Sequence, residues 1–280
     1  MTVSFDRQAA DFDLRAGLPP GAGPRIAAAV AELAPAGNGR RGVVLDLGAG
    51  TGQIGEHLAR LWGARERSRY LGIDVSGPML AVFRSKLGAD RGGSLVRADA
   101  GACWPIASGG VDLVFLSRAA HLLPPEVLVE ESLRVASPEG AVIVLGGVRS
   151  EPESLRAVVR REMRRLLAEH GGVEARRADD ARRAIAGALA ERGGEVLPAR
   201  TAASWTVVHR AGDALAAWRA KAGLGGREVT PEVQESVLRR LEDWIRERYG
   251  SLDVAREATE RYELAAIRLP KPSDRNGRVT

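Results

Sequence analysis

The sequence predicts an α/β fold whose core is a seven-stranded, mostly parallel sheet with helices on both faces. Three observations support this prediction. Short runs rich in Val, Leu and Ile recur along the chain, helical patterns alternate with them up to about residue 150, and a glycine-rich turn follows the first run. Such folds bind their ligands at the carboxyl ends of the strands. The runs that we expect to form strands are residues 43–47, 70–74, 95–99, 111–116, 141–145, 204–208 and 262–267.

Charge and composition argue against several classes of protein. The 41 basic residues are interspersed with 36 acidic ones, so the net charge of +5 does not by itself indicate a nucleic-acid surface. The single cysteine, Cys103, excludes an internal disulfide and favours a reducing, cytoplasmic compartment. The first residues, MTVSFDRQAADFD, contain early acids and no apolar segment, so we expect neither a signal peptide nor a membrane anchor.

The strongest local signal is VVLDLGAGTGQ, Val43 to Gln53, in which a buried strand leads into three alternating glycines and then into a helix. Glycines there let the chain turn tightly and let a ligand approach the backbone, and the start of the helix offers free N–H groups. A glycine loop alone does not identify the ligand. Residues 50–55 also fit the GxGxxG pattern, with Asp74 about 20 residues further on, so an NAD(P)-dependent dehydrogenase is an alternative.

Three acidic residues favour a different ligand. Asp46 lies within the first strand, where a phosphate-bearing ligand has no need of a carboxylate but a ligand with an ammonium group benefits from one. Asp74 ends the second predicted strand, where a carboxylate can accept from both hydroxyls of a ribose. Asp99 ends the third, where it can accept from an exocyclic amine. Together they indicate a ligand with a ribose, an adenine and a cationic amino-acid tail.

With these motifs the sequence resembles the class I S-adenosylmethionine-dependent methyltransferases, and most closely their ubiquinone-biosynthesis-like branch. The resemblance covers residues 5–148 and implies a Rossmann-like fold. It departs from the family pattern at Phe12, where a tyrosine is usual, and at Glu139, where a glycine is usual. The segments that carry it are Asp46–Gly52 (DLGAGTG), Gly72–Leu80 (GIDVSGPML), Ala98–Ala100 (ADA), Trp104–Ile106 (WPI), Val111–Val114 (VDLV), Glu131 with Leu133–Gly140 (LRVASPEG), and the opening Phe5–Asp6 with Ala10–Asp13 (ADFD).

The resemblance implies S-adenosylmethionine as the cofactor and a role for each residue around the loop. Asp46 would face the ammonium group, Asp74 would hold the ribose hydroxyls, and Asp99 would accept from the adenine amine. The sequence has no His or Cys pair at a metal-binding spacing, so we expect no metal. The expected cofactor-binding residues are Asp46, Gly48, Ala49, Gly50, Thr51, Gly52, Asp74, Val75, Met79, Asp99, Ala100, Ser117 and Arg118, with Val75 and Met79 flanking the adenine and Ser117 and Arg118 lining the opening.

The patterns along the chain divide it into parts. Because the helical patterns beyond residue 150 are amphipathic, we expect them to cover the active site. The predicted parts are an N-terminal helical lid over 1–36, the cofactor-binding core over 37–150, helical additions and the sixth strand covering the acceptor site over 151–250, the last strand within 251–270, and a tail over 271–280.

The expected reaction is in-line methyl transfer to a small-molecule acceptor, such as a specialised metabolite or a quinone-like intermediate, by a monomer or homodimer. His121 follows the fourth strand and is the candidate general base; the alternative is a histidine that caps a helix or shields the cofactor. An RNA-modifying methyltransferase, the dehydrogenase and a noncatalytic binding protein remain open. Leu116–Ala119 lacks the Asn/Asp-Pro-Pro-Tyr/Phe motif of enzymes that methylate the adenine amine, which disfavours nucleic acid as the acceptor.

Overall fold

The computed structural model describes residues 6, 9–35, 42–64, 68–88, 93–170, 178–220, 223–225 and 229–271. Phe5 of the opening motif and residues 272–280 of the predicted tail lie outside this part of the chain. The chain folds into two compact units. The first comprises residues 1–147, 177–203 and 262–280, and the second comprises residues 148–176 and 204–261.

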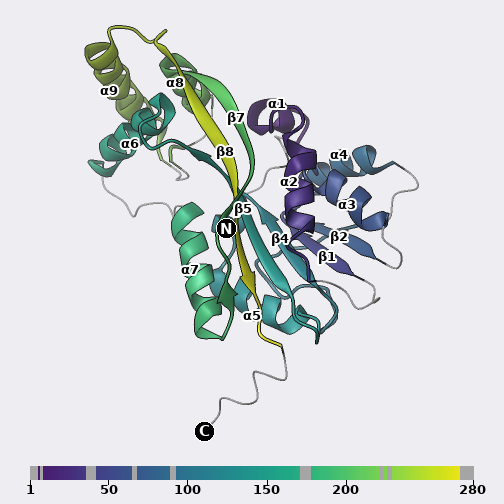
Figure 1. The fold of residues 1–280 in the computed structure, drawn as a ribbon. Helices are drawn as coiled ribbons and strands as arrows, with labels where there is room; N and C mark the ends of the chain where they lie inside the picture. The colour runs from purple at the N-terminus through teal and green to yellow at the C-terminus, as the bar shows by residue number, and fades with distance from the viewer. Residues whose placement is uncertain are drawn as a thin grey trace. The chain divides into compact units, whose positions relative to one another are not determined.

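The described strands form one eight-stranded sheet in the order β3-β2-β1-β4-β5-β8-β6, and β7 pairs with β8 (Figure 1). The five strands from β3 to β5 are parallel, whereas β6 is antiparallel to β8. The strands are β1 (Val43–Leu47), β2 (Arg69–Asp74), β3 (Gly93–Arg97), β4 (Leu113–Ser117), β5 (Val142–Ser150), β6 (Glu195–Val196), β7 (Arg200–Arg210) and β8 (Ala255–Arg268).

The predicted α/β class is confirmed, and each of the seven predicted strands has a counterpart. The prediction of seven strands was one too few, because β6 contains only Glu195 and Val196 and has no apolar run to signal it. The third strand was placed two residues too late, so Asp99 follows the end of β3 instead of belonging to it.

The topology determines where a ligand can bind. The chain runs outward from β1 to β3 and then returns to β4 on the other side of β1, so the strand order reverses between β1 and β4. In open parallel sheets the crevice outside the carboxyl ends of the strands at such a reversal is the usual ligand site. The glycine loop begins at the carboxyl end of β1 and therefore lies at this reversal.

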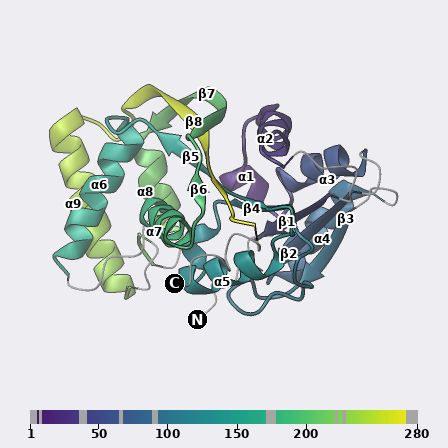
Figure 2. The ribbon, with the colours of Figure 1, turned by 60° about the horizontal axis from the view of Figure 1, so that its bottom comes forward.

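Helices cover the sheet of the first unit on both faces. α2 packs against α3 on one side, and α5 packs against α7 on the other, as Figure 2 shows. The helices are α1 (Phe12–Ala16), α2 (Ala22–Ala31), α3 (Gly55–Gly63), α4 (Gly77–Leu87), the short 3-10 helix η2 (Ala120–Leu122), α5 (Pro125–Val135), α6 (Leu155–Ala168), α7 (Ala178–Glu191), α8 (Ala211–Arg219) and α9 (Pro231–Tyr249).

The core of the first unit comes from the apolar runs that predicted the strands. Leu45, Ile73, Val114 and Ile143 are fully buried, and they belong to a cluster that α5 and α7 help to enclose. Burying a branched aliphatic side chain contributes about 1.5–3 kcal/mol, so this cluster is a main source of stability.

The second unit has a core of its own. Apolar residues at helical spacing on α6 pack against those of α8 and α9, with Val159, Leu215 and Leu241 almost completely buried. The sequence pattern of α6 predicted this amphipathic helix. None of the helices in the described part of the chain is long and apolar enough to cross a membrane.

Two helical glycines should respond in opposite ways to substitution by alanine. Alanine is better than glycine in a helix by about 1 kcal/mol. A methyl group added at Gly187 in α7 would touch nothing within 4 Å, so Gly187→Ala should raise the free energy of unfolding by about 0.5–1 kcal/mol. At Gly55 in α3 the same group would lie 2.3 Å from the Tyr70 hydroxyl and 2.7 Å from the Phe83 ring, so Gly55→Ala should lower it by about 1–3 kcal/mol.

Urea denaturation of both variants and of the wild type measures these changes in the free energy of unfolding. A stabilising effect of Gly55→Ala would show that α3 can shift away from the sheet, contrary to the close packing of Gly55 against Tyr70 and Phe83.

Candidate cofactor and acceptor site

The glycine loop adopts a backbone conformation that other residues rarely accept. Gly48, Gly50 and Gly52 have φ angles of 68°, 55° and 75°. A methyl group added at Gly52 would lie 2.1 Å from the Phe83 ring, and one at Gly48 would lie 2.7 Å from the Ala119 side chain. At Gly50 the nearest atom would be a loop carbonyl 3.9 Å away, so this part of the backbone is open to a ligand.

Hydrogen bonds hold the loop to the carboxyl end of β2. The Ile73 carbonyl accepts from the N–H groups of Gly48 and Ala49 at 2.8 and 3.0 Å. One Asp74 carboxylate oxygen accepts from the Gly50 N–H at 2.8 Å, and the other accepts from the Ser76 N–H at 2.8 Å. Burial raises the pKa of Asp74 although both of these bonds favour its ionised form. Because Ser76 caps α4 with its own side chain, capping of α4 does not account for Asp74.

Asp46 is the most deeply buried acid of the loop region. Its side chain, 2% exposed, accepts a hydrogen bond at Oδ2 from the Tyr70 hydroxyl at 2.6 Å. The other oxygen, Oδ1, is buried and has no hydrogen-bond partner among the described residues. Burial raises the pKa of Asp46 to about 7, and the nearby Asp74 carboxylate adds to this effect. A cation beside Oδ1 would relieve both the desolvation and the repulsion.

The residues expected around an adenine lie at the ends of β2 and β3. Asp99 is exposed, and its Oδ1 accepts from the Gly101 N–H at 2.8 Å. Ala100 is buried, and its carbonyl accepts from the Trp104 ring N–H at 2.9 Å. Met79 is also buried, at the start of α4, whereas Val75 is half-buried.

The carboxyl end of β4 brings three further predicted residues together. The Ser117 and Tyr262 hydroxyls lie 2.7 Å apart, and Arg118, with a φ of 58°, donates from Nη2 to Gln53 Oε1 at 3.2 Å. His121 in η2 is half-buried, and its Nδ1 is buried with no hydrogen-bond partner among the described residues. Burial, and then the positive charge of Arg182 on α7, lower the pKa of His121. The imidazole is therefore neutral at pH 7.

The N-terminal segment contacts the loop through Asp13 on α1. Its Oδ1 accepts from the Thr51 hydroxyl at 2.5 Å and from the Gln53 amide at 2.7 Å, and its Oδ2 pairs with Lys86 Nζ at 2.5 Å. Burial opposes ionisation, yet these hydrogen bonds keep the pKa of Asp13 below its usual value. Asp6 adds a contact with the start of α4, because it accepts from the Ser76 hydroxyl at 2.6 Å.

Three of these residues had no predicted role. Asp13 belongs to the opening motif of the resemblance, but its contact with the loop depends on how the N-terminal segment folds back. Tyr70 could have been found from the strand pattern, because it shares a sheet face with Asp46 when β1 and β2 pair in parallel. Tyr262 lies more than 140 residues from Ser117, and no local pattern signals that contact.

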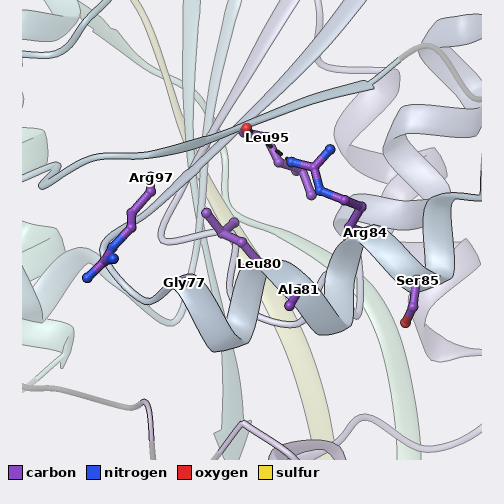
Figure 3. A pocket seen from close by; sticks show the side chains of 7 residues that line it. All are labelled: Gly77, Leu80, Ala81, Arg84, Ser85, Leu95 and Arg97. Atoms are coloured by element: carbon purple, nitrogen blue, oxygen red, sulfur yellow. Dashed lines mark hydrogen bonds between the residues drawn. The ribbon is translucent and has the colours of Figure 1, made fainter.

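Two cavities lie away from these residues. One of about 530 Å³ lies between α4 and β3, where Figure 3 shows Arg84 extending toward the Leu95 carbonyl and Arg97 on the opposite side. The other, of about 1020 Å³, includes the end of α2, the start of β5 and the end of β8, at the opposite end of the parallel strands from the loop. Neither contains an expected site residue. Within the described part of the chain, no group of three or more His, Cys, Asp or Glu residues could hold a metal ion.

Comparison with known proteins now defines the class. Residues 44–140 match the protein family described as "Methyltransferase domain". No curated protein matches the chain.

Solved structures share the fold at low identity. A protein of Bacillus halodurans C-125 assigned as a methyltransferase is 18% identical, with a TM-score of 0.54, over 87% of this chain and 98% of that chain. A protein of Anaeromyxobacter dehalogenans assigned as a type II methyltransferase is 20% identical, with a TM-score of 0.52, over 87% of this chain and 94% of that chain. A chain in the Haloferax volcanii complex of the Trm112 methyltransferase activator and an assigned methyltransferase is 19% identical, with a TM-score of 0.50, over 95% of this chain and 97% of that chain.

Residues 44–140 therefore form a methyltransferase domain, and the fold is one that assigned methyltransferases share. The chain is accordingly an enzyme of methyl transfer, with S-adenosylmethionine as its cofactor. The residues around the loop fit this cofactor on three counts. The backbone at Gly50 is open to a ligand. Asp46 Oδ1 has no hydrogen-bond partner among the described residues, and an ammonium group would supply a donor there. Each Asp74 oxygen accepts one backbone hydrogen bond and keeps a further lone pair for a ligand hydroxyl.

The buried Asp46 carboxyl should make the ligand-free protein less stable as the pH rises. Its pKa of about 7 in the fold lies above the value of 3.8 for a free side chain. The folded protein therefore binds more protons than the unfolded chain between about pH 4 and 7, and the free energy of unfolding falls across that window. Asp46→Asn, which keeps an oxygen for Tyr70, should flatten this dependence and stabilise the protein at pH 8 by about 1–4 kcal/mol.

Denaturant unfolding at pH 5 and pH 8 tests this expectation. Asp99→Asn is the matched control, because Asp99 is exposed and its replacement should leave the pH dependence unchanged. An Asp46→Asn variant with the wild-type pH dependence would contradict the assignment.

Proposed function

We propose that the chain transfers the methyl group of S-adenosylmethionine to a small-molecule acceptor and that it belongs to the ubiquinone-biosynthesis-like branch of these methyltransferases. The observation that carries the proposal is the arrangement at the reversal of strand order. The open Gly50 backbone lies beside Asp74, while Ser117 ends strand β4 and Arg118 and His121 follow it. The sequence LRVASPEG, Leu133 to Gly140, supports the branch by resemblance.

We assign the cofactor to the residues expected from the sequence. Asp74 would accept from the ribose hydroxyls, Asp46 would face the ammonium group through Oδ1, and Asp99 would accept from the adenine amine. S-adenosylmethionine, when bound, supplies a methyl group already activated on a sulfonium sulfur. The chain's own contribution is to orient the acceptor in line with that methyl group and to exclude water, and positioning of this kind can supply about 7–11 kcal/mol.

The N-terminal segment is assigned to close the site. Asp13 attaches α1 to Thr51 and Gln53, and Gln53 in turn accepts from Arg118 and from the Leu18 N–H at 3.2 Å. This segment therefore links the loop to the end of β4. We infer that it acts as the lid over the cofactor, because a rigid cover would keep water from the reacting atoms.

His121 is assigned as the general base. Its imidazole is neutral at pH 7, and because Nδ1 is buried, we assign Nε2 as the nitrogen that faces the acceptor. Nε2 would take the proton from an acceptor hydroxyl as the oxygen attacks the methyl group. The stretch Leu116–Ala119 lacks the Asn/Asp-Pro-Pro-Tyr/Phe motif of enzymes that methylate the adenine amine, which favours a small acceptor over nucleic acid. The single cysteine, Cys103, suits a reducing compartment such as the cytoplasm.

Cofactor binding tests the first assignment. In calorimetric titration S-adenosylhomocysteine should bind and NAD should not. Asp74→Ala should weaken S-adenosylhomocysteine binding by about 2–4 kcal/mol, because a partly desolvated carboxylate that accepts from two hydroxyls is lost. It should also lower the stability of the free protein by about 1–3 kcal/mol, because Asp74 accepts from Gly50 and Ser76.

Ser76→Ala separates the two effects. It removes the cap of α4, which costs about 1 kcal/mol of stability, but it should leave S-adenosylhomocysteine affinity within about threefold. Tight NAD binding without S-adenosylhomocysteine binding would refute the proposed cofactor site.

Loss of the His121 imidazole should slow the chemical step and spare cofactor binding. With an acceptor identified by a gain of one methyl group in mass spectrometry, His121→Ala should lower turnover by about 10²–10⁴-fold. The wild-type rate should rise with pH and level off below neutrality, because the pKa of His121 is lowered. Arg182→Met should move that rise to higher pH, since the Arg182 charge helps to lower this pKa.

Arg183→Met is the matched control for Arg182→Met. Both arginines are on α7 and pair with an aspartate three residues earlier, but Arg183 is exposed. Normal turnover by His121→Ala would show that positioning alone suffices. Loss of S-adenosylhomocysteine binding would instead place His121 in the cofactor shell.

A further inference from the structure

The second unit contains a basic helix face that the methyl-transfer site does not use. On α6 the apolar residues Leu155, Val159 and Met163 are buried against α8 and α9. Arg156, Arg160 and Arg164 follow one another at intervals of four residues, so they share a different face. All three lie outside residues 44–140, which match the methyltransferase domain.

One end of this face is neutralised by a buried acid. Arg156 Nη1 pairs with Glu260 Oε1 on β8 at 3.0 Å, and Glu260 is 5% exposed. The same oxygen accepts from the Ser150 hydroxyl at 2.9 Å and lies 3.3 Å from His209 Nε2. The single charge of Glu260 is thus matched by Arg156.

The other two arginines have no such partner. In the part of the chain that the structure describes, Arg160 and Arg164 make no hydrogen bond or ion pair, and Glu260 attracts Arg160 only at longer range. The remaining arginines of α6 are paired: Arg161 lies 3.5 Å from Glu153, and Arg165 bonds to Glu162 and Glu169. Among the described residues, the α6 arginines that have no carboxylate partner are therefore confined to one face of the helix.

The surroundings of Arg160 differ from those of a fully solvated side chain. Arg160 is accessible to solvent, yet burial, followed by the charges of Arg156 and Arg164, lowers its pKa to about 10. Guanidinium groups four residues apart on one helix face repel each other, and a bound dianion would turn that repulsion into attraction.

We propose that Arg160 and Arg164, with Arg156 at the margin, bind a phosphate or diphosphate group of a small ligand. Guanidinium groups donate paired N–H groups in the planar geometry that phosphate oxygens accept, and two of them can satisfy a diphosphate. This site would be separate from the cofactor site and goes beyond the proposed function, because it assigns the second unit a ligand of its own.

Calorimetric titration of the full chain with inorganic pyrophosphate tests the proposal. The wild type should bind pyrophosphate at one site, and the double variant Arg160→Met/Arg164→Met should weaken binding by about 30-fold or more. The control Arg161→Met/Arg165→Met removes the same charge from α6 and should change the affinity by less than about threefold. Equal weakening by both double variants, or no binding by the wild type, would overturn the proposal.

Two further measurements distinguish a phosphate site from a folding defect and from an RNA-binding surface. The ligand-free melting temperature of Arg160→Met/Arg164→Met should not fall, because the substitution removes a repulsion. A fall that accounts for the lost binding would count against the site. The same titration is repeated with a single-stranded RNA of about 12 nucleotides, a length within the usual site size of proteins that bind single strands. Tight binding of this RNA that pyrophosphate does not displace would also overturn the proposal.

Cofactor binding separates this proposal from the proposed function. S-adenosylhomocysteine should bind to both double variants as to the wild type, because neither removes a residue assigned to the cofactor. Failure of the phosphate site is therefore distinguishable from failure of the cofactor site.

Discussion

The attachment of the glycine loop to the end of β2 is the constraint on which the cofactor site depends. Three successive loop N–H groups are bonded there, two to the Ile73 carbonyl and one to the Asp74 carboxylate. These bonds need the left-handed backbone of Gly48 and Gly50, and they set the point at which the chain can enter α3. The Thr51 and Gln53 side chains then lie where Asp13 can bond to them, so the N-terminal segment is placed by the loop as well.

The same arrangement keeps the Asp46 carboxyl group in a position where it destabilises the fold. Asp46 belongs to a buried strand, and Gly55 approaches it so closely that a methyl group there would lie 2.9 Å from its carboxylate. A hydrocarbon side chain would suit the strand better, since a buried carboxyl with one oxygen that no described residue bonds is costly. Stability lost at one position in this way is typical of a site built to bind a cation.

The sequence could predict the parts of the fold that repeat a local pattern. Apolar runs located the strands from β1 to β5, and the spacing of glycines and acids in DLGAGTG located the loop. It could not predict β6, which is held by pairing with β8 and has no run of its own. Nor could it predict the contacts of Asp13 or the pairing of Ser117 with Tyr262, because these depend on how distant segments meet. The sequence alone does not distinguish the arginines of α6 from one another, whereas their pairing with carboxylates does so in three dimensions.

The order of strands along the chain has a consequence for synthesis. β5 ends at Ser150, whereas its sheet neighbour β8 begins at Ala255. At the usual rate of translation, about 5–20 residues per second, the edge of β5 stays without its partner for about 5–20 s. The residues exposed there, from Val142 to Leu145, are fully or almost fully buried in the finished protein. Because an apolar strand edge is a template for pairing with other chains, the nascent polypeptide is open to mispairing until β8 is made.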